Sequence, residues 1–178
     1  GARVGRSDVE AVQEMLVLFQ SSDERLGGDH GRLAIVEYLT TDVAALLTGR
    51  YSSAVTRQFM FSAAAELTFV AGWKAFDGGI HGLAERYFLT ATRLAAEADN
   101  PCLGAYILRA LAHQAADLGH GKQCLDLIDA SLTLSRPAAT PGTTALFTLL
   151  RARGLALAKD RAATATAVIA AERMLERT

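Results

Sequence analysis

Apolar residues recur along this chain at intervals of three and four positions, and this pattern predicts helices over most of its length. The stripes stop where glycine, proline, aspartate or asparagine interrupts them. No stretch shows a convincing strand pattern. The interruptions divide the chain into eight predicted helices, near residues 7–27, 32–48, 53–77, 81–97, 101–118, 121–134, 143–158 and 161–177.

Capping residues support several of these helix ends. Ser7 with Glu10 three positions later forms a candidate capping box at the start of the first helix. Gly49 predicts a left-handed cap at the end of the second helix. Gly78 and Gly79 together predict a break after the third helix.

A sequence repeat with a period of about forty residues covers the middle and end of the chain. Small residues recur at Gly72, Ala112 and Ala152, where two helices can approach closely. Such self-similarity predicts helical hairpins stacked in one all-α domain spanning residues 1–178. The other columns are Gly79, Gly119 and Lys159; Ala84, Cys124 and Thr164; Phe88, Ile128 and Val168; and Ala91, Ser131 and Ala171.

One of these hairpins resembles a tetratricopeptide repeat. Gly72, Ala84 and Ala91 match the small positions of that family, and Phe88 matches its large apolar position. The repeat is longer than the family's, and Thr68 and Ala75 stand at its tryptophan and tyrosine positions. The resemblance implies a tetratricopeptide-like right-handed superhelix of about four antiparallel helix pairs.

A longer resemblance covers essentially the whole chain. It is carried by RVG and DV within residues 3–9, LLTGRY at 46–51, AAAEL at 63–67, AGW at 71–73 and HGLAERYF at 81–88. The chain is similar to the C-terminal region of actinobacterial, Streptomyces-type transcription regulators, whose N-terminal helix-turn-helix domain binds DNA. The resemblance implies a cytoplasmic bacterial regulator, with the DNA-binding domain absent from these 178 residues.

Composition narrows the partners. The formal net charge of −1 lacks the basic surplus of nucleic-acid binders, so this segment is expected to make no direct nucleic-acid contact. No apolar run reaches the length of a membrane span, and no membrane partner is expected. Cys102 and Cys124 are too few for a disulfide framework and predict free thiols in a reducing compartment. The opening Gly1 and Ala2 suggest a fragment.

The first helix of each stacked pair is expected to line a concave groove. Helical spacing from Gly72 selects side chains that share one face, and the same offset is applied forty and eighty residues later. Apolar walls with a few polar groups are typical of a small-molecule or peptide site. The candidate groove residues are Glu66, Phe69, Trp73, Phe76 and Asp77; Tyr106, Arg109, His113, Ala116 and Asp117; and Leu146, Leu149, Arg153, Ala156 and Leu157.

The groove residues of the third helix also have structural interpretations. Trp73 and Phe76 are equally consistent with core positions, in which case the Trp73 ring N–H needs a partner. Glu66 either orients a ligand, pairs with Arg57 or Arg109, or faces water. The sequence leaves these alternatives open.

The charged residues of the fifth helix are similarly ambiguous. Arg109 and His113 lie four positions apart, so they either grip an anionic ligand or remain solvated or structural. Asp77 and Asp117 precede glycine-containing turns at helix C-termini, which disfavour negative charge. A compensating contact is therefore expected, for which local turn hydrogen bonds suffice.

Catalytic chemistry finds little support. His81, His113 and His120, with Cys124 or Asp117 nearby, form no compact metal-ligand motif. The glycine-rich segment 27–31 lacks the lysine and hydroxyl of a phosphate loop, and no serine lies in a nucleophile elbow. We therefore expect no enzyme activity, metal or cofactor.

The function predicted is a ligand-sensing or dimerisation module, or both, of a bacterial transcription regulator. Its effector would be a small molecule or a peptide. The alternative is a stand-alone tetratricopeptide-like scaffold for a protein partner or a homodimer. The last predicted helix offers a modest apolar face for such a contact, formed by Val168, Ile169, Met174 and Leu175.

Overall fold

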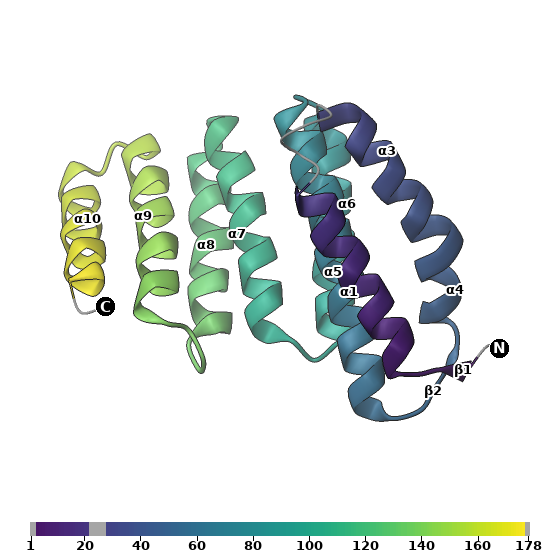
Figure 1. Cartoon of the computed structure of the whole chain (residues 1–178). Coiled ribbons are helices and arrows are strands. Elements are labelled where there is room, and N and C mark those ends of the chain that lie inside the picture. Colours follow the sequence, from purple (N-terminus) through teal and green to yellow (C-terminus); the bar gives the residue numbers. More distant parts are fainter. Residues whose placement is uncertain (1–2, 22–27, 177–178) are drawn as a thin grey trace. The chain divides into compact units, whose positions relative to one another are not determined.

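The structure, a computed structural model, describes residues 3–21 and 28–176 and is built almost wholly of helices (Figure 1). The all-α prediction is therefore confirmed. Contacts between Cα atoms divide the chain into two compact units, Gly1–Leu103 and Gly104–Thr178.

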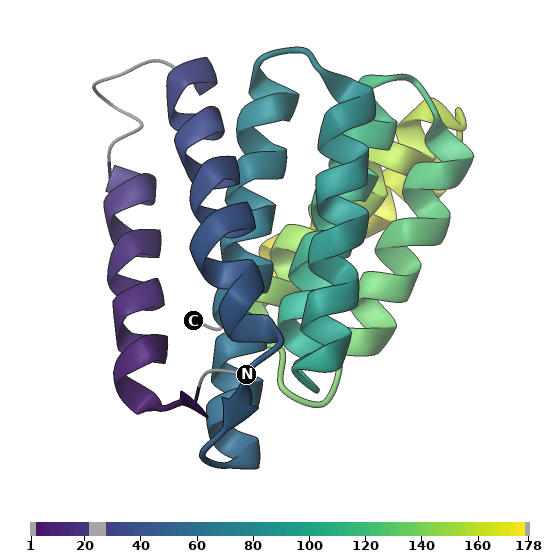
Figure 2. The ribbon, with the colours of Figure 1, turned by 90° about the vertical axis from the view of Figure 1, so that its right-hand side faces the viewer.

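In unit 1, helices α1 and α3 both pack onto the long helix α5, which is paired with α6 (Figures 1 and 2). Leu16, Ile35 and Leu67, from α1, α3 and α5, share one buried core. The elements are β1 Arg3–Val4, α1 Arg6–Ser21, α3 Gly28–Tyr38, the π-helical turn η1 Leu39–Val43, α4 Ala44–Leu47, β2 Arg50–Tyr51, α5 Ala54–Asp77 and α6 His81–Glu97.

The predicted capping box at Ser7 is wrong, because α1 already begins at Arg6. The Asp8 carboxylate instead accepts a hydrogen bond of 2.7 Å from the Gly5 backbone N–H, and Glu10 pairs with Arg6 at 2.8 Å. Helix α1 ends at Ser21, and its predicted end near residue 27 lies outside the described residues. Of Ser52 and Ser53, the two serines that the sequence offers for the start of α5, Ser53 is the cap, since its hydroxyl accepts from the Thr56 backbone N–H at 3.0 Å.

The second predicted helix contains a π-helical turn that the apolar pattern did not predict. Thr40 and Thr41 donate side-chain hydrogen bonds to the Val36 and Glu37 carbonyls, and such back-bonding loosens the regular helical ladder. The left-handed cap predicted at Gly49 is also wrong: within residues 3–21 and 28–176, positive φ among glycines occurs only at Gly79 and Gly119.

The expectation of a chain without strands is overturned by a small parallel sheet. Strands β1 and β2 pair with Arg3 opposite Arg50 and Val4 opposite Tyr51. Two residues are too short to produce an alternating pattern that a sequence window detects. Val4 is fully buried, so this ladder fastens the start of α1 to the start of α5.

Unit 2 continues the helical hairpins. Phe147, Ile128 and Cys124 lie in its core, where α7, α8 and α9 meet. A smaller cluster joins α9 to α10. Its elements are α7 Pro101–Asp117 (whose first residues fall in unit 1), α8 Gly121–Ser135, α9 Pro141–Leu157 and α10 Arg161–Leu175.

The forty-residue repeat is confirmed at the turns within the hairpins. Gly79, Gly119 and Lys159 all adopt positive φ, of 74°, 79° and 63°. Each is followed by a residue whose N–H bonds the carbonyl five positions earlier, as in Ile80 to Ala75 at 2.8 Å. This is the Schellman motif, which satisfies the last carbonyls of a helix and reverses the chain.

The repeat also predicts which positions pack between the two helices of a hairpin. Ala112, Ala152, Phe88 and Ile128 are buried, as the small and large columns predict. Gly72 shows why one position is small, because a Cβ there would lie 2.8 Å from the Phe88 ring. The columns therefore predicted the contact between the two helices of a hairpin.

Lys159→Gly is expected to stabilise the chain by about 1 kcal/mol. A residue with a Cβ in the left-handed region costs about 1–2 kcal/mol, and glycine avoids that cost at this turn. Thermal unfolding followed by circular dichroism measures the change. Lys159→Ala is the control, since alanine keeps the Cβ, and an equal gain from both variants would contradict the backbone explanation.

Candidate functional site

The predicted groove residues of α5 form an aromatic row that packs partly on its own hairpin. Ring centroids of Trp73 lie 6.2 Å from Phe69, 5.3 Å from Phe76 and 6.5 Å from Phe88, the last of which is buried in α6. Trp73, Phe69 and Phe76 are half-buried. One edge of this row thus belongs to the core and the other reaches the surface of unit 1.

The charged ends of this row differ in environment. Glu66 is half-buried one turn before Phe69, and burial raises the pKa of its carboxyl above the usual value of 4.5. Arg57, one predicted partner of Glu66, instead donates to Glu97 at 2.6 Å and stacks over Phe61. Asp77 is exposed as the last residue of α5.

Glu66→Gln is expected to raise the free energy of unfolding at pH 7 and to leave it unchanged near pH 4. Because the folded-state pKa is raised, the unfolded chain releases this proton more readily. The stability that protonated Glu66 provides is full below about pH 4.5 and is lost as pH rises through the folded pKa. Urea unfolding followed by Trp73 fluorescence tests this. Exposed Glu85→Gln is the control, and equal changes at both pH values would contradict the prediction.

In unit 2, the predicted residues of α7 lie along one face. The Arg109 guanidinium lies over the Tyr106 ring, 4.6 Å from its centroid. Burial lowers the pKa of Arg109, while Tyr106 acts in the opposite direction, and a guanidinium keeps its charge in either case. Tyr106 remains 41% exposed, so this stacked pair presents an aromatic surface edged by a cation.

About two turns beyond Arg109 on α7, Asp117 joins two other predicted residues. It forms an ion pair with Arg153 of α9, and its other oxygen lies 3.6 Å from His113 Nε2. The compensating contact predicted for Asp117 is thus a cation from a neighbouring helix, which also offsets the unfavourable helix end. His113, Asp117 and Arg153 form one charged group.

Leucines of α9 continue this surface. Leu146, Leu149 and Leu157 are each about two-fifths exposed and share a helical face with Arg153. We call this surface the α7–α9 face. It comprises Tyr106, Arg109, His113, Asp117, Leu146, Leu149 and Arg153. Ala116, also placed in the groove by spacing, is buried instead, because it packs in the core of unit 2.

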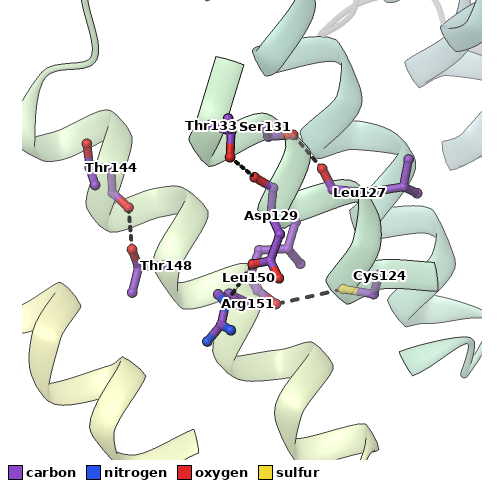
Figure 3. Close-up of polar contacts among 9 residues, drawn as sticks. All are labelled: Cys124, Leu127, Asp129, Ser131, Thr133, Thr144, Thr148, Leu150 and Arg151. Carbon is purple, nitrogen blue, oxygen red and sulfur yellow. Dashed lines mark hydrogen bonds and ion pairs between the residues drawn. The ribbon is translucent and has the colours of Figure 1, made fainter. Parts of the chain in front are cut away.

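The opposite side of α9 is fastened to α8 (Figure 3). Arg151 donates to Asp129 at 2.7 Å, and the Cys124 thiol contacts the Leu150 carbonyl. Since Arg153 binds α7 and Arg151 binds α8, α9 is tied to both helices of the preceding hairpin. The position of α9, and of the side chains that it contributes to the α7–α9 face, is therefore fixed by contacts with both α7 and α8.

Sequence reasoning missed a hollow of about 530 Å³ at the start of α5. We call it the N-terminal hollow. Val55 and Phe59 are 56% and 54% exposed there, an unusual exposure for such side chains. Helical spacing places them on the same face of α5 as Glu66 and Trp73, so this spacing could have indicated them from the sequence. The hollow is lined by Arg6, Val9, Glu10 and Gln13 of α1 and by Ser53, Val55, Thr56 and Phe59.

The residues considered for metal or thiol chemistry are dispersed. Over residues 3–21 and 28–176, no three histidine, cysteine, aspartate or glutamate side chains gather as metal ligands. The His81 ring packs edge-on against Phe76. Both cysteines are free, with Cys102 exposed and Cys124 buried. No helix in the described ranges is long and apolar enough to cross a membrane.

Comparison with protein-family models, with curated proteins and with solved structures returned no significant match. The chemistry of the chain's own surfaces is therefore the basis for a functional assignment. The α7–α9 face offers the strongest argument, because it combines exposed apolar area with oriented charges.

Proposed function

We propose that this chain is a non-catalytic sensing and dimerisation module of a bacterial transcription regulator. The observation that carries the proposal is the α7–α9 face, where exposed Tyr106 and Leu149 flank oriented cations. The resemblance to Streptomyces-type regulators supports the regulatory context. In this proposal the hairpins form a tetratricopeptide-like superhelix.

The effector would be a small molecule or short peptide with apolar area and an anionic group. Tyr106, Leu146 and Leu149 would contact its apolar part. Arg109 and Arg153 would orient its charge, with Asp117 limiting Arg153 to one direction. The aromatic row of α5, with Trp73 and Glu66, would be a separate candidate contact region within unit 1.

Regulation would follow from differential binding. An effector that binds one arrangement of the stacked hairpins better than another shifts the population toward it. A DNA-binding domain or a dimer contact attached to the module would then change position. This step requires no chemistry by the module itself.

The test uses a panel of small molecules and short acidic peptides, screened by thermal shift and by calorimetry. Arg109→Ala and Arg153→Ala should each weaken binding of a true effector about tenfold. Arg86→Ala, an exposed arginine of α6, is the matched control. Effectors insensitive to both variants would contradict the proposed site, and an effector that leaves DNA affinity of the natural regulator unchanged would contradict the sensing role.

A scaffold for a protein partner or a homodimer is the second candidate. It is favoured by the exposed leucines of α9 and by Ile169, which is 47% exposed on α10. Light scattering across a concentration series distinguishes the two. A dimer whose mass falls on Ile169→Glu substitution would support the scaffold, and a monomer at all concentrations would count against a homodimer.

A further inference from the structure

Two arginines stand side by side on the small sheet of unit 1. Arg3 and Arg50 are direct partners across the parallel β1–β2 ladder. Both are exposed, whereas Val4 is buried and Tyr51 half-buried. Because successive strand residues point to opposite faces, the two guanidinium groups extend from the same outer face.

This arrangement places like charges next to each other, which is unfavourable across a strand pair. Other arginines nearby have carboxylate partners: Arg6 binds Glu10 at 2.8 Å and Arg57 binds Glu97 at 2.6 Å. No ion pair to Arg3 or Arg50 occurs within residues 3–21 and 28–176. An anion that bridges these two arginines would remove the repulsion.

The N-terminal hollow lies at the same end of unit 1. Arg3 comes three residues before Arg6, and Arg50 three residues before Ser53, and both later residues line the hollow. Figure 1 shows β1 and β2 at the beginnings of α1 and α5. An uncompensated arginine pair and an exposed apolar hollow are thus neighbours.

We propose that this end of unit 1 docks an acidic, apolar segment of a partner protein. One or two carboxylates of that segment bind Arg3 and Arg50, and an apolar side chain enters the hollow against Val55 and Phe59. The charge complementarity specifies an acidic partner. Nucleic acid fits less well, because a phosphate backbone leaves the apolar hollow unfilled.

The experiment uses the whole chain and a short synthetic peptide that carries a glutamate pair followed by leucine and phenylalanine. Calorimetry is expected to show binding that weakens about tenfold in the Arg3→Ala/Arg50→Ala double variant. Phe59→Ser is expected to weaken it by a similar factor through lost apolar contact. A peptide with glutamine in place of glutamate should also bind about tenfold more weakly.

Matched controls come from one helix. Arg86→Ala/Arg93→Ala and Leu89→Ser change exposed arginines and an exposed leucine of α6 and should leave the affinity unchanged. Circular dichroism checks that each variant is folded. Because Arg109 and Arg153 belong to unit 2, their variants should not alter this binding, which separates the result from the proposed sensing function.

Three outcomes would overturn the proposal. They are no peptide binding at millimolar concentration, binding that is insensitive to the Arg3 and Arg50 substitutions, and arginine-dependent binding of duplex DNA in preference to the peptide. The last outcome would assign the arginine pair to a phosphate backbone instead.

Discussion

Phe88→Ala should destabilise unit 1 by about 4 kcal/mol, the largest effect expected of any single substitution considered. The Phe88 side chain is fully buried in α6 and contacts the aromatic row of α5, with its ring centroid 5.7 Å from Phe69 and 6.5 Å from Trp73. Removing it deletes apolar contacts and leaves a cavity that a helix pair cannot close fully. Urea unfolding followed by the emission of Trp73, the only tryptophan, measures the loss.

The neighbouring Leu89→Ala is the control for this result. Leu89 is 44% exposed on the same helix, so its truncation should cost far less than that of Phe88. Similar losses for the two variants would mean that α6 does not use Phe88 as its main contact with α5. The Trp73 emission of the folded Phe88→Ala variant should also shift, because the ring loses a neighbour.

Gly72→Ala and Gly82→Ala should change stability in opposite directions. A Cβ at Gly72 would lie 2.8 Å from the buried Phe88 ring and 3.1 Å from the Tyr87 Cβ, and overpacking of this kind costs about 1–3 kcal/mol. Part of that cost is offset by alanine's better helix propensity, so a net loss of about 1–2 kcal/mol is expected. At Gly82 a Cβ meets nothing within 4 Å, and a gain of about 0.5 kcal/mol is expected.

Urea unfolding of both glycine variants provides the comparison. A gain at Gly72 would show that α5 and α6 are farther apart than the structure places them. The double variant Gly72→Ala/Phe88→Leu supplies an independent check, because a smaller side chain at position 88 should relieve the clash. The free energy of unfolding of the double variant should be about 1 kcal/mol higher than the value obtained by adding the effects of the two single substitutions.

Both proposed binding surfaces present arginine cations, but these are held in place in different ways. On the α7–α9 face, Asp117 and Tyr106 hold the cations in place, so a ligand meets preorganised charges. On the β1–β2 sheet, Arg3 and Arg50 are brought together by backbone pairing alone. The first arrangement favours specificity for one ligand shape, and the second favours any suitably spaced acidic segment.

Part of the candidate site was predicted from residue types and spacing. Helical periodicity placed Tyr106, Arg109 and His113 on one face of α7, and the structure keeps them together. The same reasoning placed Ala116 in the groove, but its side chain is buried in the core of unit 2. It also named Arg57 as a possible ion-pair partner of Glu66, whereas Arg57 pairs with Glu97. Spacing along one helix is a local property, but the choice of an ion-pair partner depends on which other helix lies opposite.

The amino-acid sequence by itself determined the helices, most of their ends and the turns that repeat every forty residues. These features depend on neighbouring residues: apolar periodicity, capping side chains, and backbone freedom at positions such as Gly79 and Gly119. Tertiary structure alone decided the π-helical turn, the pairing of Arg3 with Arg50, the link from Asp117 to Arg153, and the hollow beside Phe59. Those features join segments far apart in the chain, and their distances arise only when the apolar faces of whole helices pack together.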